Sequence, residues 1–136
     1  MGPSMERRLL QIAVATACLV PLAAGGTGII RGAQMIGGVT PPVPTDLDSH
    51  FRYLSGLLLG IGLAFAVCIP RIERAGALFA ALSAIVVVGG AGRLFSLASD
   101  GVPGPGHLFG LAMELGAVPL LLLWQRSLAV RSDRTA

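Results

Sequence analysis

The sequence predicts an all-α membrane protein, with four transmembrane helices in an antiparallel up-down-up-down bundle that forms one domain over residues 1–136. Charged residues make up 12% of the chain, about half the roughly 25% of a typical soluble domain. Hydrophobic residues make up 54%, and the mean hydropathy is +0.78. The apolar residues also form long blocks instead of short alternating runs, which is typical of membrane-spanning helices.

The apolar blocks predict spans at about residues 9–30, 49–69, 75–98 and 107–124. Each is close to the roughly 20 residues that an α-helix needs to cross a bilayer. A longer Gly/Pro-rich segment joins the first two spans, and two tight turns, at residues 70–74 and 99–106, join the others. Short connections place consecutive helices antiparallel, which gives the up-down order.

The arginines predict the orientation of the bundle, and all ten basic residues are arginine. With four spans, most of them fall on one side: Arg7, Arg8, Arg71, Arg74, Arg126, Arg131 and Arg134. The other side has Arg31 and Arg52 beside several aspartates. The positive-inside rule therefore predicts that both termini lie in the cytoplasm, and Trp124 at the inner end of the fourth span fits an interfacial anchor.

The N-terminal block has a second interpretation. Two arginines, an apolar run and then Ala23-Ala24 resemble a secretory signal with a cleavage site. Cleavage would leave three spans and an external N-terminus. Because the apolar run continues to Ile30, beyond a typical signal core, the sequence favours a first membrane span.

Two charged residues, Arg93 and Glu114, interrupt the third and fourth apolar blocks. A charge in hydrocarbon is costly and normally faces the bundle interior with a partner. Counted from the outer surface of the membrane, Arg93 lies about six residues and Glu114 about seven residues into its span. Both are therefore roughly 10 Å deep. Side chains lean toward the N-terminus of their own helix, so on antiparallel neighbours these two lean toward each other. They are predicted to pair.

The pair is the predicted core of a polar cluster in the outer third of the bundle. Its candidate ligand-binding residues are Arg93, Glu114, Arg52, Tyr53, Ser96 and His107. Gly89 and Gly110 each lie four residues before a member of the pair, so a small residue is expected one turn away on each charged face. Gly56 and Gly60 predict a close helix contact in the second span. Asp48 is the predicted N-cap of that span.

Other site chemistry finds little support in the sequence. Cys18 and Cys68 form no Cys-x-x-Cys motif and are expected to be buried small hydrophobes. His50 and His107 belong to no ligand spacing, so no metal and no cofactor is predicted. The net charge of +3 comes from arginines that flank apolar blocks, so it does not indicate nucleic-acid binding.

Three stretches resemble the small bacterial membrane proteins grouped as domain-of-unknown-function family 4345. They are Asp48 to Gly56, Gly89 to Ser96, and the turn at Gly101 and Pro103 that leads to Glu114. The resemblance runs from the first span to Trp124, although His50 stands where family members often have an acidic residue. It implies the four-span fold and topology and a place in the bacterial cytoplasmic (inner) membrane, and it transfers no catalytic residue.

Three functional classes remain open. The first is a non-enzymatic accessory protein or small-ligand-binding membrane protein, which the sequence favours. The second is a membrane enzyme acting on a small lipophilic substrate, with Glu114 as acid or base and Arg93 stabilising an oxyanion. The third is a small transporter or proton path. The partners expected are the lipid bilayer and a small lipophilic ligand, with a homo-oligomer or a larger membrane complex left open.

Overall fold

The computed structural model describes residues 3–133, where all regular secondary structure is helical. Four of its helices are long and apolar enough to cross a membrane, which confirms the predicted fold class. The elements are α1 (Pro3–Arg31), η1 (Gly32–Met35), α2 (Thr45–Cys68), η2 (Ile69–Arg71), α3 (Gly76–Asp100), α4 (Pro105–Ala112), η3 (Met113–Ala117) and α5 (Val118–Asp133). Arg134, used above for the orientation, lies outside the described residues.

The helices are longer than the apolar blocks that predict them. Helix α1 begins six residues before residue 9, and α5 continues nine residues beyond Trp124. The added turns contain polar residues such as Glu6 and Arg131 that are compatible with a helix outside hydrocarbon. Hydropathy thus locates the part of each helix that is suited to lipid, whereas the helix ends depend on the flanking residues.

The chain divides into two compact units. The α1–α2 unit comprises Val14–Val67. The α3–α5 unit comprises the remaining residues, which are the start of α1 up to Ala13 and the chain from Cys68 onward. Each unit is described by itself below.

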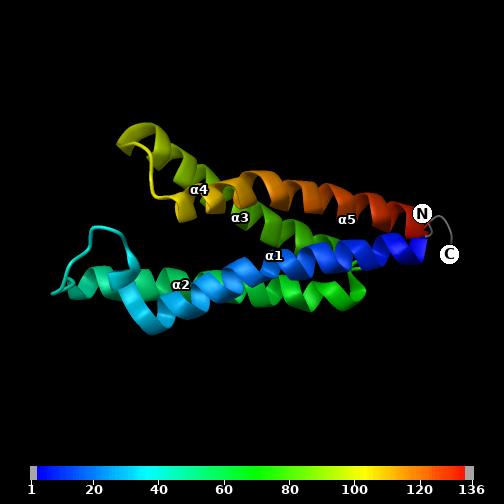
Figure 1. Cartoon of the computed structure of the whole chain (residues 1–136). Helices are drawn as coiled ribbons and strands as arrows, with labels where there is room; N and C mark the ends of the chain where they lie inside the picture. The colour runs from blue at the N-terminus through cyan, green and yellow to red at the C-terminus, as the bar shows by residue number, and fades with distance from the viewer. Residues whose placement is uncertain (1–2, 134–136) are drawn as a thin grey trace. The chain divides into compact units, whose positions relative to one another are not determined.

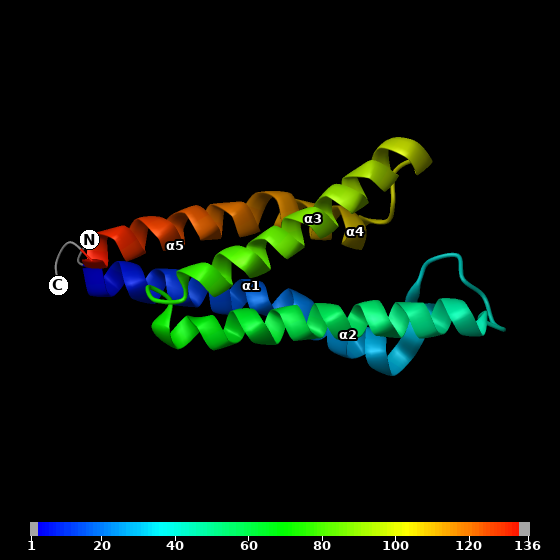
Figure 2. The same cartoon turned by 180° about the vertical axis from the view of Figure 1, so that it is seen from behind.

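In the α1–α2 unit, the two helices run antiparallel and lie side by side in both views (Figures 1 and 2). Glycines of α1 permit the close approach. A Cβ on Gly25 would lie 2.6 Å from the backbone nitrogen of Leu59 and 2.7 Å from the carbonyl oxygen of Ser55, and a Cβ on Gly28 would collide with the Ser55 side chain. The backbones are therefore in direct contact here, as expected where small residues line a membrane helix interface.

Gly56 and Gly60, which predict a close helix contact in α2, do not make one with α1. A Cβ on Gly60 would meet nothing within 4 Å, and a Cβ on Gly56 would meet only the end of Ile29, at 4.0 Å. The small residues that permit close contact in this unit are instead Gly25 and Gly28 of α1 and Gly62 of α2, where a Cβ would lie 3.1 Å from Pro21.

In the α3–α5 unit, α3 packs antiparallel against η3 and α5 (Figure 2). Near the start of α3, a Cβ on Gly76 would lie 3.6 Å from the side-chain nitrogen of Gln125. Near its end, Gly90 faces η3. The buried apolar side chains of this unit are Leu10, Cys68, Ile72, Phe79, Leu82 and Leu128. This packing fixes which face of α3 meets the fourth span.

Candidate functional site around Arg93 and Glu114

Glu114 lies in a π-helical turn that interrupts the fourth span. In this turn, η3, the backbone N–H of Val118 donates to the carbonyl oxygen of Met113, five residues earlier. An α-helical hydrogen bond spans four residues, so the turn is wider than its neighbours. Such turns inside α-helices are frequent at functional sites. The sequence predicts the span but not this interruption.

Arg93 and Glu114 form a two-pronged ion pair between α3 and η3. The Nε of Arg93 donates to Oε2 of Glu114 at 3.0 Å, and its Nη2 donates to Oε1 at 3.0 Å. This fork geometry gives stronger, more directional bonding than a single contact. The Arg93 side chain is 34% exposed and that of Glu114 is 18% exposed, so the pair is half-buried in the chain alone.

His107, in the first turn of α4, extends the pair. Its Nδ1 lies 2.8 Å from Nη1 of Arg93. An arginine can only donate, so Nδ1 accepts this bond, and the imidazole is then neutral with its proton on Nε2. All three guanidinium nitrogens of Arg93 are thus engaged by the fourth span. The His107 residue as a whole is exposed.

Two glycines shape this cluster. A Cβ on Gly110 would lie 3.6 Å from the Cζ of Arg93, so the guanidinium lies against the bare backbone of α4. On α3 the closely packed glycine is Gly90, where a Cβ would come within 2.9 Å of the Glu114 Cβ. Gly110 therefore contacts the charged group directly, whereas a Cβ on Gly89, one turn before Arg93, would meet nothing within 4 Å. A shift of one residue rotates the helical face by about 100°.

The other predicted members have interactions outside this cluster. Ser96 is exposed and donates to Oδ2 of Asp100 at 3.2 Å, within α3. Arg52 and Tyr53 belong to the α1–α2 unit. Tyr53 is 62% exposed and lies near His50, with their ring centroids 6.4 Å apart. The structure therefore brings together Arg93, Glu114 and His107, and gives Ser96 and Arg52 other partners.

Arg52 closes the C-terminal end of α1. It pairs with Asp48 at 2.7 Å, and its Nη1 donates to the carbonyl oxygens of Ile29 and Ile30. The last carbonyls of a helix lack partners within the helix, so a cation bonding to them is favourable. No sequence pattern indicates this role, because the contact joins residues more than twenty positions apart.

Asp48 does not cap α2, which begins three residues earlier at Thr45, so the N-cap prediction is wrong. Its Oδ1 accepts from the backbone N–H of Ala33 at 2.8 Å, just beyond α1. Gly32 fits between these groups with a φ of 69°, in the left-handed region that favours glycine. A Cβ on Gly32 would collide with both Asp48 and Arg52.

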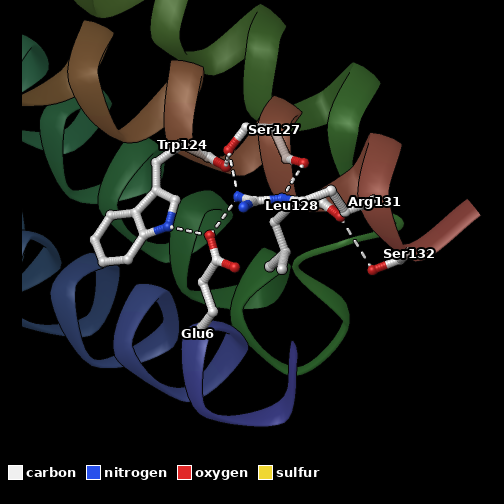
Figure 3. Close-up of polar contacts among 6 residues, drawn as sticks. All are labelled: Glu6, Trp124, Ser127, Leu128, Arg131 and Ser132. Atoms are coloured by element: carbon white, nitrogen blue, oxygen red, sulfur yellow. Dashed lines mark hydrogen bonds and ion pairs between the residues drawn. The ribbon is translucent and has the colours of Figure 1, made fainter. Parts of the chain in front are cut away.

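A second polar cluster joins the start of α1 to α5 (Figure 3). The indole Nε1 of Trp124 donates to Oε1 of Glu6 at 3.2 Å, and Arg131 donates to the same oxygen. Arg131 also donates to Oγ of Ser127 at 3.0 Å. Glu6 is only 12% exposed. The sequence identifies Trp124 as an interfacial anchor but does not indicate its polar partner.

Metal chemistry is not supported by the described residues. Within them, no three or more histidine, cysteine, aspartate or glutamate residues form a group that could hold a metal ion. The Arg93 cluster instead provides hydrogen-bond donors, because it joins the guanidinium of Arg93 to the imidazole of His107. Its chemistry suits an oxygen-bearing ligand.

A family model described as a domain of unknown function, DUF4345, matches residues 9–125. This range contains the whole Arg93, His107 and Glu114 cluster. No curated protein and no solved structure matches the chain. The family description assigns no activity, so the function has to be argued from the site.

Proposed function

The chain belongs to the DUF4345 family of unknown function, and from this premise we propose that it is a non-enzymatic integral membrane protein that binds a small lipophilic ligand. The ligand site is the cluster of Arg93, Glu114 and His107, in the outer third of the membrane. The observation that carries the proposal is the forked ion pair held on a π-helical turn, with an exposed histidine bonded to the same guanidinium.

The ligand is an apolar molecule with an oxygen-bearing head group. Arg93 has five N–H donors, and its hydrogen bonds to Glu114 and His107 engage three of them. The remaining guanidinium hydrogens and the Nε2–H of His107 are donors suited to a carbonyl, carboxylate or phosphate oxygen. The surrounding helices are apolar enough to contact the lipophilic part of such a molecule.

The enzymatic alternative is less well supported. As an acid or base, Glu114 would need a carboxylate oxygen within reach of substrate. Both of its oxygens accept hydrogen bonds from Arg93 instead. A carboxylate held in this way is better suited to orienting the guanidinium than to transferring a proton, which favours ligand binding.

Arg93→Gln is expected to remove a ligand that copurifies with the wild-type chain. A hydrogen bond to a charged group contributes about 1.5–3 kcal/mol, so retention should fall at least about tenfold. Native mass spectrometry and solvent extraction of the full chain, purified in mild detergent, would measure it. His107→Ala, at an exposed position, tests the same site with less risk to folding. Ser96→Ala is the matched control and should retain the ligand.

Equal ligand recovery from wild type, Arg93→Gln and His107→Ala would contradict the site. Recovery of no small molecule from the wild-type chain, from any membrane preparation, would contradict the ligand-binding function itself. Detection of a chemically altered form of an added candidate ligand would favour the enzymatic alternative.

The second part of the proposal is that both termini face the cytoplasm of a bacterial inner membrane. The arginine distribution supports it. The ion pair of Glu6 with Arg131 also supports it, because it joins the start of α1 to the end of α5 at one end of the α3–α5 unit. A reporter active only in the cytoplasm, fused after Ala136, is expected to be active, and a periplasmic reporter inactive. The opposite pattern would refute this orientation.

A further inference from the structure

A network of polar contacts joins three segments at one end of the α3–α5 unit. Arg7 donates to the carbonyl oxygen of Pro70 at 2.8 Å, and Gln11 donates to that of Ile69 at 2.8 Å. From α5, the buried Gln125 donates to the carbonyl oxygen of Ile72 at 2.9 Å. Together with the Glu6 cluster of Figure 3, these bonds hold the start of α1, the turn around η2 and α5 together.

Both glutamates of this network are already paired. Glu6 pairs with Arg131, and Glu73 pairs with Arg7 at 3.3 Å. Their side chains are only 12% and 19% exposed. The negative charges of Glu6 and Glu73 are therefore neutralised inside the network.

Four arginines remain on the surface of this end. We define the basic end surface as Arg8, Arg71, Arg74 and Arg126. Each is exposed and is the immediate chain neighbour of a network residue, namely Arg7, Pro70, Glu73 or Gln125. Among the described side chains, residues 4–132, none of the four forms an ion pair. The surface therefore presents uncompensated positive charge.

We propose that the basic end surface binds the phosphates of anionic phospholipid headgroups. Arginine suits this role because its planar donors match phosphate oxygens. The helices that lead into this end are long and apolar enough to cross a bilayer, so the four guanidinium groups fall where headgroups lie. The inference depends on membrane insertion, but it is independent of the Arg93 cluster.

The test uses the full chain in nanodiscs that contain phosphatidylcholine and phosphatidylglycerol. Native mass spectrometry then compares the two lipids that stay bound after the nanodisc is removed. Wild type is expected to be enriched in phosphatidylglycerol, and each arginine replaced by glutamine should lower the enrichment by up to about fivefold. Replacement of all four by glutamine should abolish it, whereas replacement of all four by lysine should largely preserve it.

Arg31→Gln is the control. Arg31 is also exposed and forms no ion pair with the described residues, but it lies at the other end of α1. Arg31→Gln should leave the phosphatidylglycerol enrichment near the wild-type value, whereas Arg74→Gln should lower the enrichment. Equal effects of these two variants, or persistent enrichment in the four-glutamine variant, would overturn the proposal. Failure of the wild-type chain to insert into nanodiscs would overturn the membrane assignment as well, so the two failures are distinguishable.

Discussion

Glu114→Gln is expected to destabilise the folded chain by about 2–3 kcal/mol, because Arg93 would keep its charge without the carboxylate that it bonds. Removing one partner of a buried pair typically costs about 3–5 kcal/mol, and the partial exposure of this pair places it at or below the lower end. Arg93→Leu should cost a similar amount. The measurement is the free energy of reversible unfolding of the full chain in detergent, monitored by circular dichroism.

The double variant separates a true pair from two independent residues. Residues in direct contact usually show coupling of about 0.5–3 kcal/mol, so the double variant should lose clearly less than the sum of the single losses. Ser96→Ala on the same helix is the control, with an expected change within about 0.5 kcal/mol. Strictly additive losses would be incompatible with the forked ion pair.

Gly25→Ala is expected to cost about 3 kcal/mol, since its methyl group would meet backbone atoms of α2 at 2.6 and 2.7 Å. Forced overpacking costs about 1–3 kcal/mol, and backbone atoms cannot rotate away as a side chain does. The α1–α2 hairpin must separate to accommodate the methyl group. Thermal unfolding of the full chain in detergent measures the loss, and a cross-link between cysteines introduced into the two helices reports the separation.

Gly26→Ala gives a control at the next residue of the same helix. A Cβ there would meet nothing within 4 Å. Because alanine is the better helix former, this variant should be unchanged or more stable by up to about 1 kcal/mol. If both variants unfold at the same midpoint, the close packing at Gly25 is not what holds the hairpin together.

The positions of residues along the helices could be predicted from the sequence. Apolar blocks locate the spans, and the number of residues from a helix end gives the depth of a charged side chain. This is why Arg93 and Glu114 could be matched across α3 and the fourth span. Such reasoning works because lipid penalises an unpaired charge far more than water does.

Rotation about the helix axis could not be predicted in the same way. Gly90 rather than Gly89 faces η3, and the glycines that allow the hairpin to close are Gly25, Gly28 and Gly62 rather than Gly56 and Gly60. Apolar residues surround each span on most sides, so the sequence contains little amphipathic signal to mark the packed face. The roles of Arg52 and Glu6 depend on long-range contacts to backbone carbonyls or to an indole, which have no local pattern.

The π-helical turn also affects helical phase downstream of the site. A π turn holds about one residue more than an α turn, so α5 leaves it rotated relative to a straight continuation of α4. Two contacts of the fourth span lie far apart along it: Glu114 bonds to Arg93, and Gln125 donates to the carbonyl oxygen of Ile72. Both contacts hold only while the residue count between them stays fixed. Insertions and deletions should therefore be tolerated poorly between positions 114 and 125, even where every individual side chain is replaceable.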